Sequence, residues 1–449
     1  MQFKCNNHCI QENRMARCFI KGTRNRPYLM PPSIDDWISR DHSVRFIDSC
    51  VEHIDLSKFY EQYSHEGKPP YDPNLMLKIL VYAYSKGIRS SRKISKACEE
   101  EVAFRWLTGN IIPDHSAICR FRNRHKELFK SVFDETLRLA DGSGLLKLEN
   151  IYLDGTKTKA NAALESNRSL DRIREEVESI VEEAESVDKK ENKEFGEDNR
   201  GDLLPPELAD PQSRRERLKA AKARLEAEKA EEPEEDSLDS EPRGNKEKAN
   251  VTDPDSRIMK TRKGWIQGYN CQAVTDENQF IVAAEVTQHC NDSQQLELML
   301  EQVSENLKSA GIEQSPDTAS TDAGYWREGL DIKKIEKEGP ELIISPSKDW
   351  KQRKRDREKP PPRGRIHKGM TQRELMERKL RTKRGKHIYS KRGQTVEAVF
   401  GHNKEVLGFC RFLLRGLNRV RGEWMLQCSV LNLLKIFRLS GGARLMATG

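Results

Sequence analysis

The feature that most constrains the fold is an acidic stretch, residues 165–250, that interrupts an otherwise basic chain. It contains 27 acidic and 17 basic residues but a single aromatic residue, Phe195. The 449-residue chain as a whole carries a net charge of +7, so the remainder is strongly basic. So polar a stretch cannot bury a hydrophobic core, and we expect it to be disordered or to form a solvated helical hairpin.

Length and hydropathy exclude several classes of protein. The chain is long enough for about three domains, which rules out a peptide hormone or a disulfide-stapled mini-protein. No stretch approaches the ~18 apolar residues that cross a bilayer, so we expect a soluble protein without a membrane partner. The start of the chain lacks the apolar core of a secretory signal, which predicts a reducing compartment and mostly buried thiols.

The first 27 residues are expected to form a variable tail that contains cysteines. Cys5, His8, Cys9 and Cys18 lie close together there but fit no standard zinc spacing. A zinc site and a merely tethered chain end both remain open, and we assign this tail no role.

Residues 28–148 are predicted to form an all-helical domain. One helix follows the capping residue Asp72, and a later basic helix begins at Asp114. Residues 81–130 hold 11 basic and 5 acidic residues. Short helices that end in a basic one favour a helix-turn-helix-like DNA-binding domain, with a solvated charged face as the alternative. The candidate DNA-contacting residues of this helix are Arg120, Arg122 and Arg124.

The segments on either side of the acidic insert, 149–164 and 251–449, show alternating strand and helix signals. The predicted elements are strands at 151–158, 265–274 and 280–287, a helix from 296 to 307, a strand ending at Asp322, a helix at 332–337, a strand at 342–344 and a long helical stretch at 395–439. This is the element order of the ribonuclease H fold. We therefore expect an α+β protein overall, with an all-helical N-terminal domain and an α/β domain whose mixed five-stranded sheet is flanked by helices.

In that architecture, acids on the first strand, at the end of the fourth and on the closing helix can meet. This sequence offers Asp154, Asp322 and Glu397 at those places. Magnesium prefers oxygen ligands, and two such ions can stabilise both the attacking and the leaving oxygen of an in-line displacement at phosphorus. Each acid alone is more often a turn former, a cap or half of an ion pair. Their joint placement favours a metal site.

A second pattern surrounds Glu397. Tyr389, Arg392, Glu397 and Lys404 follow the spacing Y-x2-R-x4-E-x6-K. Residues seven apart on a helix are separated by about two turns and share a face. The carboxylate of Glu397 and the ammonium of Lys404 are therefore expected to line one groove, where the lysine would grip a phosphate.

Seven short stretches resemble motifs of the DDE transposases of bacterial insertion sequences, in the branch with a helical N-terminal domain, a charged insert and a C-terminal Y-R-E-K signature. The stretches are 31–37 (PPSIDDW), 114–116 (DHS), 152–157 (YLDGTK), 253–257 (DPDSR), 268–270 (GYN), 321–325 (TDAGY) and 396–401 (VEAVFG). They span nearly all of the chain beyond its first 25 residues. In one form of the family signature three residues separate arginine from glutamate, whereas four do here.

The resemblance implies a metal-binding catalytic triad of Asp154, Asp322 and Glu397 that holds Mg2+ or Mn2+, as two ions. It also implies that Tyr389, Arg392 and Lys404 contact DNA near the cleavage point. The implied partners are double-stranded DNA, at the element ends and the target, and a second copy of the chain in a synaptic complex. The implied location is the bacterial cytoplasm, in association with the nucleoid.

The function predicted from these observations is an insertion-sequence transposase that binds terminal inverted repeats, nicks DNA and joins the freed 3′-hydroxyl to a target. Residues 346–388, with 17 basic and 5 acidic residues, are expected to be a DNA-contacting loop, or alternatively a loop that only aids solubility. Two other functions stay open. One is an inactivated or domesticated transposase that acts as a DNA-binding protein, and the other is a related nuclease that cuts without joining.

Overall fold

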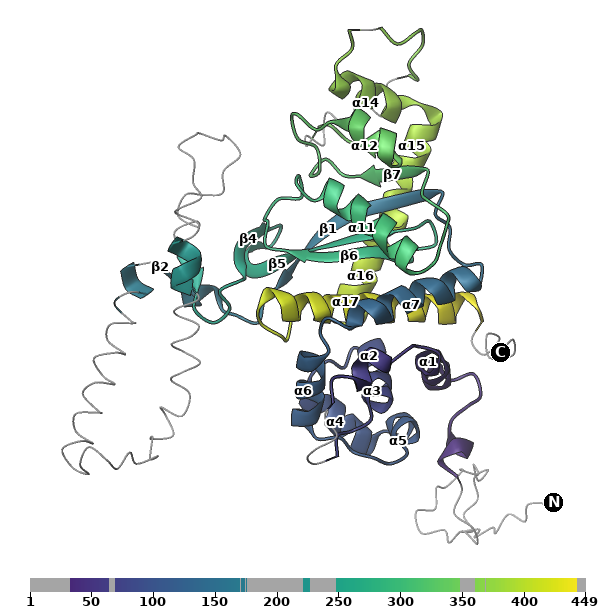
Figure 1. Cartoon of the computed structure of the whole chain (residues 1–449). Helices are drawn as coiled ribbons and strands as arrows, with labels where there is room; N and C mark the ends of the chain where they lie inside the picture. The colour runs from purple at the N-terminus through teal and green to yellow at the C-terminus, as the bar shows by residue number, and fades with distance from the viewer. Residues whose placement is uncertain are drawn as a thin grey trace, which may run out of the picture.

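A computed structural model describes residues 33–63, 69–169, 171–173, 175, 221–226, 248–347, 360–367 and 369–441. Figure 1 shows a cluster of N-terminal helices and, next to it, a sheet flanked by helices. The predicted tail at 1–27 and most of the acidic insert lie outside the described residues. The chain thus combines a helical N-terminal region with a mixed α/β region, as expected.

The N-terminal region packs short helices around one apolar core. Asp72 caps α3 by accepting a 2.9 Å hydrogen bond from Asn74 N, and Asp114 caps α6 by accepting from Ser116 N and Ala117 N. The helices are α1 (Ser43–Glu52), α2 (Ser57–Tyr60), α3 (Pro73–Ser85), α4 (Ser91–Glu100), α5 (Val102–Thr108), α6 (His115–Arg124) and α7 (Phe129–Gly142), preceded by a 3-10 turn (Ile34–Trp37).

A six-stranded mixed sheet forms the centre of the α/β region. Its strands are β1 (Asn150–Lys159), β4 (Arg257–Thr261), β5 (Gly264–Thr275), β6 (Ile281–Thr287), β7 (Thr318–Thr321) and β8 (Glu341–Ile344). They lie in the order β4–β5–β1–β7–β8, and β6 also pairs with β5. β5 is antiparallel to β1, whereas β7 is parallel to β1 and β8 is parallel to β7.

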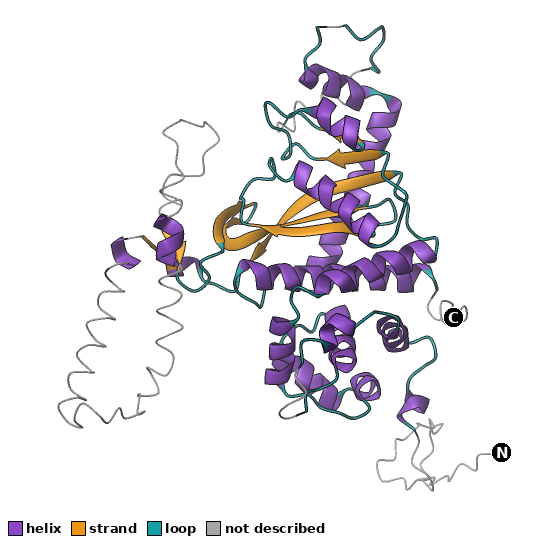
Figure 2. Ribbon diagram, in the orientation of Figure 1, coloured by secondary structure: helices purple, strands orange, loops and turns teal. Residues whose placement is uncertain are grey.

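The expected five-stranded sheet was wrong by one strand, β4. The reason is the length of β5, which is long enough to take two partners on the same edge. Residues 264–268 of β5 pair with β4, and residues 270–275 pair with β6. The additional strand lies at the end of the sheet that is nearest to β2 (Asn167–Ser169), which Figure 1 labels and Figure 2 shows in the same orientation.

Helices pack against this sheet and link it to the N-terminal region. They are α11 (Leu296–Ser309), α12 (Ile332–Glu338), α14 (Gln372–Arg381), α15 (Lys383–Ser390), α16 (Val396–Gly401) and α17 (Leu417–Leu439). α17 packs against both α7 and β6, and its residues contribute to the cores of both regions. None of the described helices is long and apolar enough to cross a membrane.

The helical stretch expected at 395–439 is interrupted. A π-helical turn (His402–Val406) follows α16, and a non-helical segment then leads to α17. Gly408 and Gly416 have φ values of 65° and 81°, which favour glycine and end helical geometry. Between them Phe409 and Phe412 turn into the core, where Phe409 packs on Trp424 and Phe412 on Tyr269.

Arg89 joins the two regions through this interrupted segment. Its guanidinium donates to Arg411 O at 2.8 Å and to Gly408 O at 3.2 Å, and it lies over the ring of Phe409. It also pairs with the buried carboxylate of Glu423 at 3.3 Å. The N-terminal helices are therefore fixed to the segment that follows α16.

The described residues bear on two expectations about the charged segments. The described ends of the acidic insert form a two-stranded sheet of β2 (Asn167–Ser169) and β3 (Lys248–Asn250) beside a small apolar cluster. The expected basic loop at 346–388 was wrong from residue 372 onward, because residues 372–381 and 383–390 are the helices α14 and α15. Residues 348–359 and 368 lie outside the described chain.

Candidate active site

Strand pairing brings two of the predicted acids together. β1 and β7 are parallel neighbours in which Leu153 pairs with Thr321. The next residues along the two strands, Asp154 and Asp322, therefore lie side by side where β7 ends. Adjacent strands are about 4.8 Å apart, so the two carboxylates interact directly with each other's charge.

The guanidinium of Arg392 pairs with one predicted acid and interacts electrostatically with the other two. Arg392 is only 6% exposed, and its Nη2 is 3.6 Å from Asp154 Oδ2. Burial lowers the pKa of Arg392, but the surrounding negative groups outweigh burial and the net pKa is raised. The groups that raise it are Asp154, Tyr389, Asp322 and Glu397.

Arg392 reaches this position because the chain changes direction between α15 and α16. Residues 391–394 form a 3-10 turn, and Thr395 has φ and ψ values of −108° and −98°, which are neither helical nor extended. This turn accommodates the extra residue between Arg392 and Glu397, so the longer spacing still lets the arginine face β1. Arg392 also lies 5.6 Å from the centre of the Tyr389 ring.

The electrostatics of Asp154 reflect its crowded surroundings. Burial raises its pKa to about 7, and the charges of Asp322 and Asp292 act in the same direction. Arg392 and the backbone N–H of Gly155, which donates at 2.9 Å, lower it. Asp154 is thus a carboxylate whose charged form depends on a nearby cation.

The carboxylates of the site are suitable ligands for a hard divalent cation. In this structure, however, the guanidinium of Arg392 pairs with one of them. Carboxylate oxygens are the ligands that Mg2+ prefers, and the crowding of Asp154, Asp322 and Asp292 creates a demand for positive charge. Across the described ranges, no three histidine, cysteine or acidic side chains stand close enough to share one ion. Arg392 supplies the positive charge among the acids.

The ammonium of Lys404 contacts β1, the strand that carries Asp154. Its ammonium contacts Thr156 Oγ1 and donates to Lys157 O at 3.3 Å, which fixes it two residues further along β1. Glu397 and Lys404 both belong to the segment that packs on β1, although a π-helical turn carries the lysine. The ammonium is positioned beside the acids rather than paired with one of them.

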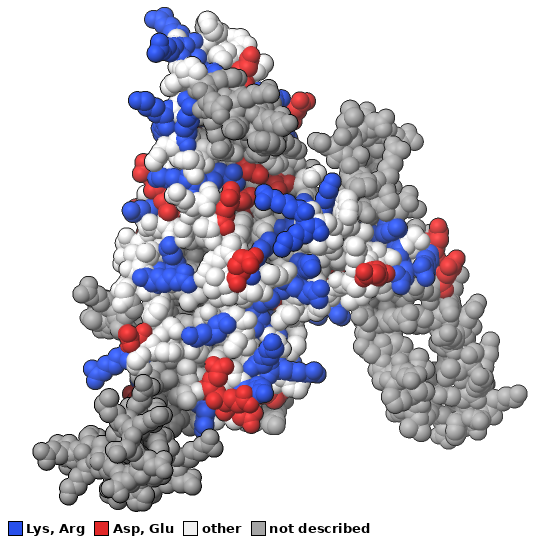
Figure 3. All heavy atoms as spheres, turned by 180° about the vertical axis from the view of Figure 1, so that it is seen from behind, with Lys and Arg blue, Asp and Glu red and all other residues white. Residues whose placement is uncertain are grey.

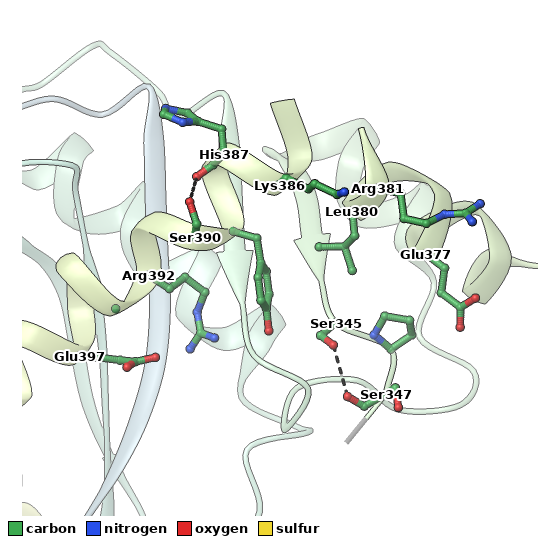
Figure 4. A pocket seen from close by; sticks show the side chains of 13 residues that line it. Ser345, Ser347, Glu377, Leu380, Arg381, Lys386, His387, Ser390, Arg392 and Glu397 are labelled. Atoms are coloured by element: carbon green, nitrogen blue, oxygen red, sulfur yellow. Dashed lines mark hydrogen bonds between the residues drawn. The ribbon is translucent and has the colours of Figure 1, made fainter. Parts of the chain in front are cut away.

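A cavity of about 630 Å³ opens beside Glu397 and Arg392 (Figure 4). α14 contributes Leu380 and Arg381, and α15 contributes Lys386 and Tyr389. In Figure 4, Glu397 and Arg392 extend from one side of this space and Arg381 and Glu377 from the other. The cavity thus lies between Glu397 and Arg392 on one side and the two basic helices on the other.

The three arginines singled out on α6 are placed differently. Arg120 and Arg124 are exposed, and the guanidinium of Arg124 lies over the ring of Tyr63. Arg122 is buried and donates to Arg89 O at 2.8 Å and to Ser91 Oγ. Arg122 therefore holds α6 against the start of α4 and is not presented to a partner.

Basic side chains also cover other parts of the surface. Figure 3 shows Lys and Arg over the end formed by α14 and α15 and across the middle of the face seen from behind. Acidic groups lie between them. Lys379 and Arg384 are paired with Glu341, whereas Arg381 lines the cavity.

Sequence reasoning missed Asp292, which lies just before the helix expected from 296 to 307. α11 begins at Leu296 with Gln295 in the capping position, and the Asp292 carboxylate instead accepts from Asn270 Nδ2 and Gln272 Nε2, both at 2.7 Å. The alternation of Asn270 and Gln272 on one face of β5 was visible in the sequence. Their acceptor was not, because it comes from another part of the chain.

Other motif residues have structural roles. Asp253 accepts hydrogen bonds from Tyr269 OH at 2.9 Å and from Gly416 N at 3.1 Å, and Asp255 Oδ2 accepts from Leu417 N. The DPDSR motif therefore ties β5 to the start of α17. The motif therefore supports the framework around the site, and we assign it no part in the reaction.

Two family models match the chain. The one described as "Transposase domain (DUF772)" matches residues 32–124, which reach the end of α6. The one described as "Transposase DDE domain" matches residues 238–433, which include Asp322 and Glu397 and begin after β1. No curated protein and no solved structure matches the chain.

Proposed function

Because this chain belongs to the DDE transposases of the insertion-sequence type, we propose that it binds the terminal inverted repeats of its element and catalyses DNA strand cleavage and strand transfer. It would act in the bacterial cytoplasm, at the nucleoid. Two copies would hold the two element ends, because both ends must be joined to one target.

The observation that carries the proposal is that Arg392 pairs with Asp154 at 3.6 Å and that Asp322 and Glu397 also raise its pKa. These acids come from β1, the end of β7 and α16, and the order in which β5, β1, β7 and β8 pair is the one expected of a ribonuclease H-like domain. Residues this far apart in sequence converge only through the fold. Their convergence beside a basic cavity supports phosphoryl transfer on DNA.

In this proposal, Asp154, Asp322 and Glu397 would hold Mg2+ or Mn2+, as two ions. A bound pair would supply the charge that stabilises both the attacking and the leaving oxygen at phosphorus. Lys404 is fixed on β1 two residues beyond Asp154, where it would contact a DNA phosphate. Tyr389 and Arg392 line the cavity and would contact the DNA there. In cleavage, water attacks the phosphorus and the 3′-oxygen leaves; in joining, the freed 3′-hydroxyl attacks a target phosphorus and displaces a target 3′-oxygen.

DNA recognition is assigned to two parts of the chain. Arg120 and Arg124 are exposed on α6 in the N-terminal region and are candidates for reading the inverted repeats. The basic helices α14 and α15 border the cavity and would hold the DNA backbone without regard to sequence. Arg122 is not proposed for this role, because it is buried.

One observation favours a second candidate, a DNA-binding protein without strand transfer. Arg392 pairs with Asp154, and no described group of three acids can share an ion. If that arrangement also persists on DNA, the protein recognises element ends without cutting them.

The test is an end-cleavage assay on a duplex that carries the native flank of the element. With Mg2+ the protein should nick at the element end and join the 3′-end to a second duplex. Asp154→Ala, Asp322→Ala and Glu397→Ala should each abolish nicking and preserve binding. Binding without nicking by the native chain would select the second candidate, and nicking without joining would identify a nuclease.

A further inference from the structure

We propose that Asp292 is a fourth carboxylate of the active site, which adds negative charge beside Asp322 and strengthens the binding of a divalent cation there. The proposal rests on the proposed function, since it concerns the same site. Asp292 lies in the segment between β6 and α11, outside the triad inferred from the sequence.

Two motif glycines create the space that Asp292 occupies. A β-carbon at Gly155, directly after Asp154, would lie 2.5 Å from Asp292 Oδ1. A β-carbon at Gly324, two residues after Asp322, would lie 3.3 Å from Asp292 Oδ2 and 2.9 Å from Asp322 Oδ1. Neither glycine has a positive φ in this structure, so close packing and not backbone conformation explains the absence of a side chain.

Hydrogen bonds fix the orientation of the carboxylate. Asp292 Oδ1 accepts from Asn270 Nδ2 and Gln272 Nε2, both on β5. The buried Tyr325 hydroxyl donates to Gln272 Oε1, which turns the amide of Gln272 so that its nitrogen faces Asp292. The TDAGY motif thereby supplies an acid, a glycine that makes room for Asp292 and a tyrosine that orients its partner.

The second oxygen of Asp292 is directed toward the side of the site where Asp322 lies. Oδ2 faces Gly324 and Asp322, and within the described part of the chain no hydrogen bond to it is present. The carboxylates of Asp322 and Asp292 border the same point in space, the position of a β-carbon on residue 324. A carboxylate held by amides on one oxygen and open on the other can attract a cation to its neighbour.

The experiment measures Mn2+ binding to the full chain, without DNA, by titration calorimetry. Asp292→Asn retains an oxygen for the two amide donors and replaces the atom that faces Asp322. It should weaken Mn2+ binding about tenfold or more, the range found when groups that support metal ligands are removed. Its metal-free Tm should equal or exceed that of the native chain, because a like-charge repulsion with Asp322 is lost.

The matched control is Glu285→Gln, which neutralises another partly buried acid of the same sheet. Glu285 contacts Arg421 and Gln302 rather than the acid cluster, so this variant should bind Mn2+ as the native chain does. Equal weakening by both variants would overturn the proposal, because it would show a general effect of charge. A lowered metal-free Tm with native affinity in Asp292→Asn would indicate a structural role and overturn it as well.

Two further variants separate this proposal from the proposed function. If Asp322→Asn loses Mn2+ binding while Asp292→Asn keeps it, the fourth carboxylate is refuted and the function stands. If the native chain binds no Mn2+, both fail. If Asp292→Asn does not fold, Tyr325→Phe takes its place, because it removes only a hydroxyl. Severalfold weaker Mn2+ binding by Tyr325→Phe would support the proposal, and native affinity would overturn it.

Discussion

Arg392 Nη2 lies 3.6 Å from Asp154 Oδ2, so the acid on the central strand is neutralised by an arginine of the same chain. Both groups are largely removed from solvent, and burial of an unpaired charge would be costly. The arginine thus stands where positive charge is needed when no ion is bound. A divalent cation that enters the site must compete with it.

Replacement of the arginine should alter the pH dependence of metal binding. Arg392 lowers the pKa of Asp154, whose value burial raises to about 7. In Arg392→Gln the pKa of Asp154 should therefore rise further, and the midpoint of Mn2+ binding against pH should move to higher pH. The control is Lys391→Gln, whose native ammonium pairs with Glu277 at 3.3 Å. An unshifted midpoint in Arg392→Gln would contradict the pairing.

Asp154→Asn should make the stability of the metal-free protein less sensitive to alkaline pH. The carboxyl of Asp154 has a folded pKa of about 7 against a usual value of 3.8. Its contribution to the free energy of unfolding is therefore fully present below pH 3.8 and is lost as pH rises through 7. Between pH 5 and pH 8 the native chain should lose on the order of 1–3 kcal/mol more of this free energy than the variant. Urea denaturation with a chelator at both pH values measures this, and equal losses in the two proteins would refute it.

Arg89→Ala should destabilise the joint between the two regions. The change removes two hydrogen bonds to backbone carbonyls and leaves the buried Glu423 without its arginine. A loss of about 2–4 kcal/mol in the free energy of unfolding is expected. Lys96→Ala is the control, since its exposed ion pair with Glu100 should contribute about 0.5 kcal/mol or less. Similar losses in both variants would show that Arg89 has no special role.

The basic helices should contribute to the salt dependence of DNA binding. Arg381→Ala combined with Lys386→Ala removes two cations that line the cavity. The slope of log Kd against log salt should fall by about 2 on non-specific duplex DNA, because fewer counterions are released. Lys308→Ala combined with Lys333→Ala removes two exposed charges from α11 and α12 and should leave the slope unchanged. If the first variant kept the slope of the native chain, the cavity would not contact bound DNA.

The sequence pattern was sufficient for the main elements of the α/β region. Alternation in Ile151 to Asp154 and the run at 265–274 predicted β1 and β5, because strands buried in a sheet keep a period of two. It could not predict β4, since a five-residue edge strand carries little signal of its own. The break after residue 406 was also missed, because apolar residues at helical spacing continue through the non-helical segment.

The positions of the site residues could be predicted where those residues belong to a regular strand or helix. Asp154 and Asp322 end up side by side because of strand register, which the expected fold implied. Asp292 could not be recognised, because it lies in a connection and its position depends on amides from β5 and on two glycines elsewhere. The burial of Arg122 was likewise not predictable, since its partner Arg89 lies in the connection between α3 and α4 and its partner Ser91 begins α4.

The central claim is that Asp154, Asp322 and Glu397 serve one cation-binding site. The most direct measurement replaces Mg2+ with Fe2+ and adds ascorbate and peroxide, so that hydroxyl radicals cut the polypeptide next to the bound ion. Mapping of the fragments by mass spectrometry should give cuts close to residues 154, 322 and 397 together, suppressed by excess Mg2+ and lost in Asp154→Ala. Cuts near only one of these residues, or at positions unaffected by Mg2+, would contradict the account.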